Sequence, residues 1–217
     1  MSIEVLTRQV EEQLTRFCVS FLRQPFEHRS EHSIHIQIAN SLLKTENLTT
    51  TPFLQITAPD MAASQKVWTV SRIQKEWPTA STLAPAKNDR PEDTWRRGNF
   101  DLAILPERGP GDPYQVSSWK RFYSGHEPSP DLIIEVGLDY GASKHLAGDI
   151  EKFKKAKNSC PAYFIHLFRD RSTLLEAELV EVSRLCDEAS MNRVFCERVS
   201  LDQNIESPAL AFIGRVN

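Results

Sequence analysis

The chain has 217 residues, of which 40% are hydrophobic and 25% are charged, and its formal net charge is −3. These proportions are ordinary for a globular protein, so they exclude a chain that is disordered throughout, and the length suits one domain better than two. The negative charge excludes a general attraction to a polyanion, so contact with nucleic acid would need a local positive surface or a partner chain.

The cysteines and the apolar runs bear on the compartment. The four cysteines are scattered without a CxxC pair, a spacing that fits neither a zinc knuckle nor a secreted disulfide framework. The first apolar positions are interrupted by acidic residues, which excludes a signal peptide. No apolar run is long enough to span a membrane. We therefore expect a reduced, cytoplasmic protein that does not contact a membrane.

Two helices are predicted at the start of the chain. Apolar residues recur every three to four positions over 3–23, and Pro25 ends that helix. Ser30 is the expected N-cap of a second helix that runs from Glu31 to about Lys44. Glu31 lies on the apolar stripe of this helix, one turn before the first buried position. An acid in a first turn suits the helix dipole, but its alignment with the buried face is less ordinary.

The middle of the chain predicts strands separated by long loops. Residues 66–70 alternate like a strand, and 96–105 form a strand that ends before Pro106. Thr-, Pro- and Ser-rich or Pro- and Asp-rich segments predict irregular structure over 45–66, 78–94 and 106–130. Loops of this length in a compact domain usually have a function or are mobile.

The last third predicts alternating strands and helices. Residues 131–136 are an apolar run with one acid, as expected of a strand buried on both faces. A helix over 143–157 should carry its lysines largely outward. The remaining expected elements are strands at 163–168, 193–199 and 209–216 and a helix at 173–189. The order predicts an α/β fold, a mixed sheet flanked by helices.

Two acids interrupt the apolar strands. Asp101 follows Phe100, and Glu135 stands within Leu-Ile-Ile-Glu-Val. Burial of an unpaired carboxylate costs several kcal/mol, roughly, unless a cation neutralises it. A hard divalent cation, which prefers oxygen ligands, would explain both acids together. The alternative is a salt bridge to a buried basic residue, with Arg97 or Lys144 as the candidate partner.

A helix that carries Glu31, a strand with Asp101, a strand with Glu135 and a following helix together resemble the PD-(D/E)XK nuclease superfamily. The resemblance covers roughly residues 30–170. It implies a restriction-endonuclease-like core over 30–170 in a single domain, with an added N-terminal helix in 1–25 and a C-terminal helix and strands in 171–217. It also implies a Mg²⁺ or Mn²⁺ site formed by Asp101, Glu135, the Val136 carbonyl and Glu31.

The chain departs from this pattern at one position. The family places a lysine two residues after the glutamate, where this chain has Gly137. Some members supply that lysine from the following helix, so Lys144 is the expected catalytic lysine, with Lys152 one to two turns further along. The other interpretation of Lys144 is a solvated residue in the first turn of its helix.

Several histidines and basic residues lie outside this motif. His28, His32 and His35 invite a zinc interpretation, but no further Cys or His follows at ligand spacing, so we expect solvated surface histidines. His166 should be a hydrogen-bonded core histidine. Basic residues mixed with aromatics suit backbone contact and stacking on bases. The expected nucleic-acid contacts are Arg96, Arg97, Lys120, Arg121 and Lys152.

The sequence therefore predicts an endonuclease that hydrolyses DNA phosphodiester bonds through a metal-activated water, in a restriction, phage-defence (antiviral) or repair setting. Expected partners are DNA and either a second copy of the chain or a larger protein complex. Gly137 and the negative charge favour an alternative, a catalytically inactive member that binds nucleic acid or assembles complexes. In a third interpretation Glu135 is salt-bridged, no metal binds, and the chain is a partner-binding subunit.

Overall fold

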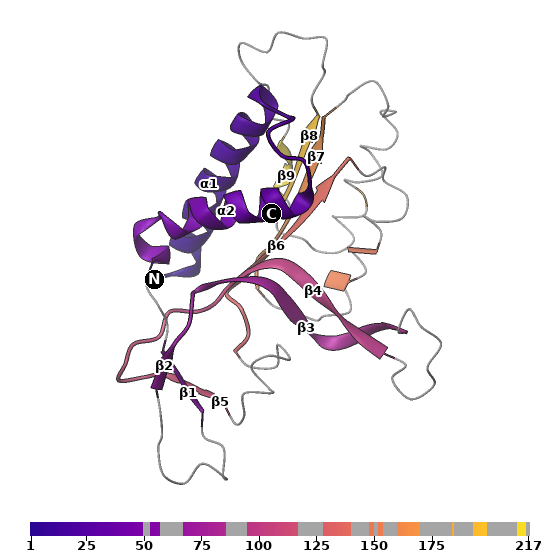
Figure 1. The fold of residues 1–217 in the computed structure, drawn as a ribbon. Coiled ribbons are helices and arrows are strands. Elements are labelled where there is room, and N and C mark those ends of the chain that lie inside the picture. Colours follow the sequence, from indigo (N-terminus) through magenta and orange to yellow (C-terminus); the bar gives the residue numbers. More distant parts are fainter. Residues whose placement is uncertain are drawn as a thin grey trace.

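The protein is a mixed α/β structure with two sheets (Figure 1). The computed structural model describes residues 1–49, 53–56, 67–85, 95–116, 128–139, 148–149, 152–153, 160–169, 184, 193–198 and 212–215. The helices with described bounds are α1 (Ile3–Arg23), α2 (Glu31–Leu43) and the short 3₁₀ helix η1 (Glu46–Leu48), and residues 148–149, 152–153 and 184 are also helical. The strands are β1 (Phe53–Ile56), β2 (Val67–Thr69), β3 (Ile73–Pro85), β4 (Trp95–Ile104), β5 (Tyr114–Val116), β6 (Leu132–Leu138), β7 (Ala162–Phe168), β8 (Arg193–Arg198) and β9 (Phe212–Arg215).

The larger sheet has the strand order β3-β4-β6-β7-β8-β9. The pairs β3–β4 and β4–β6 are antiparallel, the pairs β6–β7 and β7–β8 are parallel, and β9 closes the sheet antiparallel to β8. The smaller sheet has the order β2-β1-β5. A mixed sheet with helices beside it agrees with the α/β architecture that the sequence predicts.

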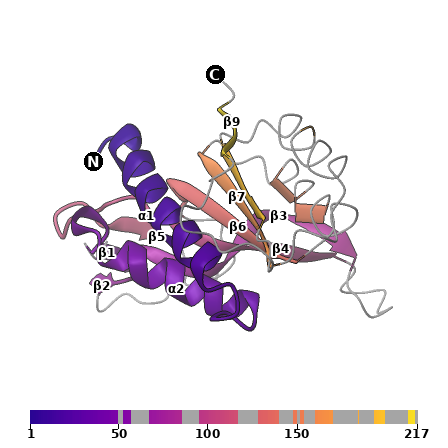
Figure 2. The same ribbon diagram turned by 90° about the horizontal axis from the view of Figure 1, so that it is seen from above.

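The two N-terminal helices lie on the same side of the larger sheet (Figures 1 and 2). Helix α1 begins after Ser2, whose hydroxyl accepts a hydrogen bond from the Val5 N–H, and its bounds match the prediction. Ser30 precedes α2 as predicted, but its side chain makes no capping hydrogen bond. Among the described helices, none is long and apolar enough to cross a membrane.

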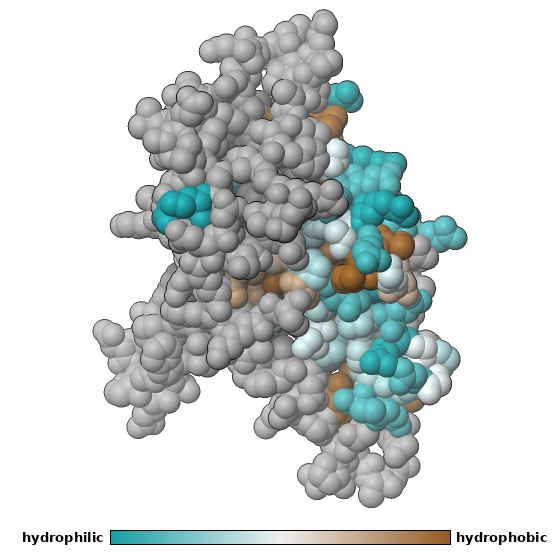
Figure 3. Space-filling model, turned by 180° about the vertical axis from the view of Figure 1, so that it is seen from behind, coloured by the Kyte–Doolittle hydropathy of each residue, from teal (hydrophilic) through white to brown (hydrophobic). Residues whose placement is uncertain are grey.

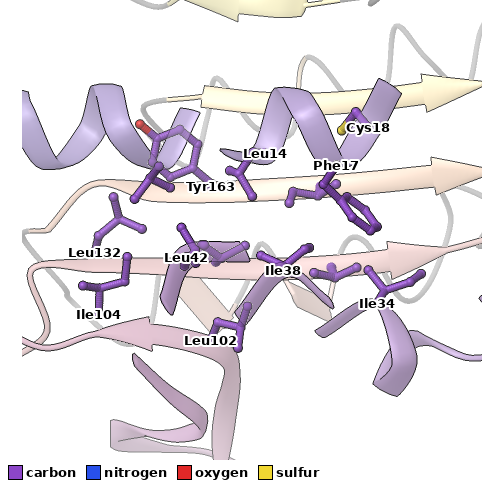
Figure 4. Close-up of a cluster of buried hydrophobic side chains, with 14 of the residues drawn as sticks. Leu14, Phe17, Cys18, Ile34, Ile38, Leu42, Leu102, Ile104, Leu132 and Tyr163 are labelled. Atoms are coloured by element: carbon purple, nitrogen blue, oxygen red, sulfur yellow. The ribbon is translucent and has the colours of Figure 1, made fainter. Parts of the chain in front are cut away.

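The main core lies between these helices and the sheet. Figure 4 shows side chains of α1, α2 and the strands meeting in one cluster, including Leu14, Ile38, Leu102 and Tyr163. Residues 132, 134 and 136 of β6 belong to this cluster, so Glu135, at the intervening position, is directed to the opposite face of the sheet. Every residue of β6 is buried, so both faces of the strand are covered.

Several segments differ from the sequence predictions. Strand β1 and helix η1 lie in a range predicted to be irregular, β3 continues to Pro85 through a predicted loop, and β5 lies within the predicted loop 106–130. These strands were not predicted because their segments contain prolines and threonines, which are typical of loops. Strand β3 is an edge strand, where Pro78 removes no hydrogen bond that an interior neighbour needs.

The hydrophobic residues on the described surface lie in small, separate patches (Figure 3). Seen from behind, this surface is mostly hydrophilic with separate hydrophobic spots (Figure 3). Isolated apolar residues on a surface are ordinary in globular proteins. Charged groups that are buried are less ordinary.

Candidate active site

The two acids that the sequence singles out lie on neighbouring strands. Strands β4 and β6 pair antiparallel, and the last residues paired at that end are Leu102 and Ile134. Asp101 and Glu135 are the next residue of each strand beyond this last pair. The Asp101 charge raises the pKa of Glu135, because like charges that lie close together repel. The adjacency of the acids agrees with the sequence prediction, and it requires compensating positive charge.

Glu135 is neutralised by Lys152. The Glu135 side chain is 2% exposed and that of Lys152 is 13% exposed, and the ammonium forms an ion pair with Oε1 of Glu135. The same Nζ lies 3.3 Å from Oδ1 of Asp149 and donates a hydrogen bond of 2.8 Å to the Asn99 carbonyl. Because residues 148–149 and 152–153 are helical, one turn separates Asp149 from Lys152. The sequence prediction that Lys152 faces largely outward is wrong, since its ammonium is directed toward Glu135 and Asp149, while its predicted contact with nucleic acid stays a prediction.

Burial and the ion pair shift the pKa values of this pair in the same direction. Desolvation raises the pKa of Glu135 well above its ordinary value, the Asp101 and Asp149 charges raise it further, and Lys152 only partly opposes them. Desolvation alone would lower the pKa of Lys152, but the carboxylates of Glu135, Asp149 and Asp101 outweigh it and raise that pKa. Lys152 is therefore firmly protonated, while Glu135 takes up a proton more readily than an exposed glutamate.

Asp101 is held by a backbone amide and a histidine. Its Oδ2 accepts a hydrogen bond of 2.7 Å from the Val136 N–H and lies 3.4 Å from Nε2 of the buried His35. Burial alone would raise the pKa of Asp101, but contacts with His35 and Val136 and the charge of Lys152 together bring it below its ordinary value. Asp101 is thus the acid of the pair that stays ionised. Both of these contacts go to Oδ2, so neither engages Oδ1.

Glu31 fastens helix α2 to the end of β6. Its Oε1 accepts a hydrogen bond of 3.1 Å from the Leu138 N–H. The side chain therefore comes to the strand that carries Glu135, as the alignment of Glu31 with the buried face suggested. One helical turn later, His35 reaches Asp101, so two side chains of one α2 face contact both acid-bearing strands.

A third acid stands in line with the first two. In the pairing of β3 with β4, Glu76 falls between the pairs Lys75–Leu102 and Trp77–Phe100, as Asp101 does on β4, and neither acid has a partner in this ladder. Its φ of 56° is in the left-handed region, which a residue with a Cβ adopts only with strain. The Lys75 ammonium lies 3.8 Å from its Oε1. Three carboxylates thus cross three neighbouring strands, each with a basic group beside it.

The histidine predictions are partly wrong. His28 and His35 are buried, not solvated, and His166 is fully buried as expected, with its ring edge against Phe164. His32 is exposed. Neither the contact of His35 with Asp101 nor the position of Glu76 was predicted. The spacing of His35 from Glu31 carried a signal for the first, but the second required strand β3, which the sequence had not revealed.

Other predicted site residues are not tested. Lys144, Lys120 and Arg121 lie outside the described residues, and so do the side chains of Arg96 and Arg97, whose backbones belong to β4. Val136 and Gly137 are buried in β6 beside Glu135. Comparisons of the chain with protein-family models, with curated proteins and with solved structures gave no match.

Proposed function

We propose that the chain is a metal-dependent nuclease that hydrolyses DNA phosphodiester bonds, with Asp101, Glu135 and Lys152 as its catalytic residues. The single observation that carries this proposal is the ammonium of Lys152 against Glu135, beside Asp101 on the neighbouring strand. Two adjacent carboxylates and a buried lysine are the groups that the resemblance to the PD-(D/E)XK superfamily requires. Lys152, from the helical residues after β6, replaces the lysine that is missing at Gly137.

The donor set fits a divalent cation such as Mg²⁺ or Mn²⁺. Asp101 and Glu135 offer hard oxygen ligands from neighbouring strands, and the lowered pKa of Asp101 keeps one of them ionised. When bound, the ion lowers the pKa of a coordinated water and neutralises developing charge on phosphate oxygens. Glu31 and the Val136 carbonyl remain candidate ligands at the rim of the same site.

The residues of the chain have separable tasks in this mechanism. Asp101 and Glu135 hold the cation, and the Val136 N–H together with His35 fixes the orientation of the Asp101 carboxylate. Lys152 is buried and protonated, so it is suited to orienting the attacking water and stabilising negative charge on the phosphate. The proposal names DNA as the substrate, and a restriction, antiviral-defence or repair setting, because of the resemblance to the PD-(D/E)XK superfamily.

A second candidate function has its own support. The ion pair of Glu135 with Lys152 satisfies the buried acid without any metal, as in a subunit whose nuclease-like domain serves only for binding or assembly. Gly137 and the net charge of −3 also favour an inactive, nucleic-acid-binding module. Titration calorimetry with Mn²⁺ on the wild type and on Glu135→Gln separates the two, because an ion at the active site is lost in that variant and a purely structural ion pair binds none.

Cleavage assays test the proposal directly. Supercoiled plasmid and labelled single-stranded DNA are incubated with Mg²⁺ or Mn²⁺, and we expect Asp101→Asn, Glu135→Gln and Lys152→Met each to lose activity by about 100-fold or more. Lys44→Met is the matched control, because Lys44 is an exposed lysine at the end of α2. Lys144→Ala decides between the two lysines: with Lys152 as the catalytic group, cleavage by this variant is retained.

Two outcomes would contradict the proposal. Absence of cleavage by folded wild-type protein with either metal, with DNA binding retained, would establish the inactive module. Undiminished cleavage by Asp101→Asn would show that the activity comes from another site or from a contaminant.

A further inference from the structure

A cluster of metal-ligating groups lies beside the acid pair, on the other side of His35. His32, His35 and Glu76 each offer one ligand atom, and these atoms all lie within 4.8 Å of one another. Helix α2 supplies the two histidines from positions three apart, which share a helix face, and strand β3 supplies the glutamate. The elements that meet here are the ones that also position Asp101.

Buried His35 is the strongest sign that this cluster takes a ligand. Its side chain is 3% exposed, and among the described residues neither of its ring nitrogens has a hydrogen-bond partner of good geometry. Buried polar atoms are rarely left without a hydrogen bond, so the ring nitrogens of His35 call for an explanation. Nε2 faces the Asp101 carboxylate at 3.4 Å. A proton on Nε2 directed at that carboxylate leaves the lone pair of Nδ1 for a cation, the arrangement in which a carboxylate orients a metal-binding histidine.

The conformation of Glu76 points to the same ligand. A glutamate with a φ of 56° is held in a strained backbone state, at a position of β3 that has no partner in the ladder although both of its neighbours, Lys75 and Trp77, are paired with β4. In a regular strand this side chain would share a face with Asp101 and add to the repulsion of the acids. The left-handed turn instead brings its carboxylate to the two histidines.

A cation already stands against two of the three groups. The Lys75 ammonium lies 2.9 Å from Nδ1 of His32 and 3.8 Å from Oε1 of Glu76. Lys75, His32 and Glu76 are all exposed, so their side chains can rearrange, and the cluster opens to solvent on that side. Positive charge is therefore favoured at this position, and a metal ion can displace the ammonium without disturbing the core.

We infer that His32, His35 and Glu76 form a binding site for a divalent transition-metal cation of the zinc class. Two imidazoles and one carboxylate are ligands that Zn²⁺ accepts and that Mg²⁺ does not prefer, so this site differs from the all-oxygen site of Asp101 and Glu135. Three protein ligands leave a fourth position for water. The ion ties α2 to the edge strand β3. The inference stands independently of the proposed nuclease activity, because the two sites share no ligand.

Zinc and cobalt titrations of metal-free protein test the site. We expect one equivalent of Zn²⁺ by calorimetry, and a visible absorption band of bound Co²⁺ that one equivalent of Zn²⁺ removes and excess Mg²⁺ does not. His32→Ala and Glu76→Gln, both at exposed positions, should each weaken Zn²⁺ binding by about 100-fold. Lys75→Met should strengthen it several-fold, about two- to fivefold, because the competing ammonium is gone.

The controls separate this site from the acid pair. Glu46→Gln, at an exposed acid of η1, and Glu135→Gln should leave Zn²⁺ affinity within about threefold of wild type. Circular dichroism and thermal unfolding establish that each variant is folded. Absence of Zn²⁺ binding by the wild type, or unchanged binding by His32→Ala, would overturn the inference. Loss of Zn²⁺ binding in Glu135→Gln with retention in His32→Ala would place the ion at the acid pair and overturn it as well.

Discussion

Replacement of Lys152 by methionine is the most informative single change, because it leaves Glu135 buried without its partner. Removal of one member of a buried ion pair costs roughly 3–5 kcal/mol. We expect the lower end, about 3 kcal/mol at pH 8, because the Lys152 side chain is 13% exposed and Glu135 can take up a proton. For a domain of this length, about 2–4 °C per kcal/mol converts that loss into a fall in Tm of about 6–12 °C.

The pH dependence of this loss identifies its cause. The folded-state pKa of Glu135 lies above the ordinary value of 4.5, so its contribution to stability is present at low pH and is lost as pH rises through the folded pKa. Without the ammonium, which lowers it, this pKa rises further. The destabilisation by Lys152→Met should therefore be greatest near pH 8 and shrink as the pH falls toward 4.5.

Urea denaturation of four proteins measures the effect: wild type, Lys152→Met, Glu135→Gln and the double variant, at pH 8 and pH 5. The double variant should recover most of the stability lost in Lys152→Met, since a neutral amide needs no counter-charge. Lys44→Met, the exposed control, should lie within about 0.5 kcal/mol of wild type. A pH-independent loss, or no recovery in the double variant, would refute the reasoning that an unpaired Glu135 charge is responsible.

Three further predictions concern the core and the loops. Arg72 is fully buried, donates a hydrogen bond of 2.8 Å from Nε to the Leu105 carbonyl, and forms an ion pair of 3.4 Å with Asp131. Arg72→Met should therefore lower the free energy of unfolding, measured by urea denaturation, by about 3 kcal/mol. A loss below about 1 kcal/mol would contradict a structural role for Arg72. Leu14→Ala should lower the free energy of unfolding by about 2–5 kcal/mol, because Leu14 of α1 is fully buried in the same cluster as residues of β6 and β7. If α1 were only an addition outside the core, the protein would tolerate this change. Burial raises the pKa of the Cys160 thiol to about 11, so its reactive thiolate appears only as the pH rises toward that value. At pH 8, peptide mass spectrometry should therefore show that Cys160 is alkylated far more slowly than a free thiol. Equal alkylation rates would contradict the prediction.

Sequence reasoning was most successful where one physical signal dominated. Helical periodicity gave the bounds of α1, and a single acid in an apolar strand marked Asp101 and Glu135 as a pair on neighbouring strands. The pair could be predicted because burial of each charge demanded a common explanation. The strand β3 could not, because its stability comes from pairing with β4 and its own residues favour a loop.

The lysine shows a different limit. Lys152 belongs to a run of lysines, and such a run is typical of a solvated helix face. Nothing in one sequence tells which lysine of the run turns inward, because that depends on how the helix sits over β6. His35 and Glu76 were missed for a related reason: their significance comes from contact between α2 and β3, which are 30 or more residues apart in the chain by their bounds.

The hydrogen bond from the Val136 N–H to Asp101 makes a backbone amide a spectroscopic probe of the site. Where β4 and β6 diverge, this amide is bonded to a side chain in place of the opposing strand. Its chemical shift and its exchange with solvent therefore report on the charge and position of one carboxylate. Binding of an ion, a proton or a substrate at Asp101 therefore changes a single resonance. The measurement does not require a catalytically active protein.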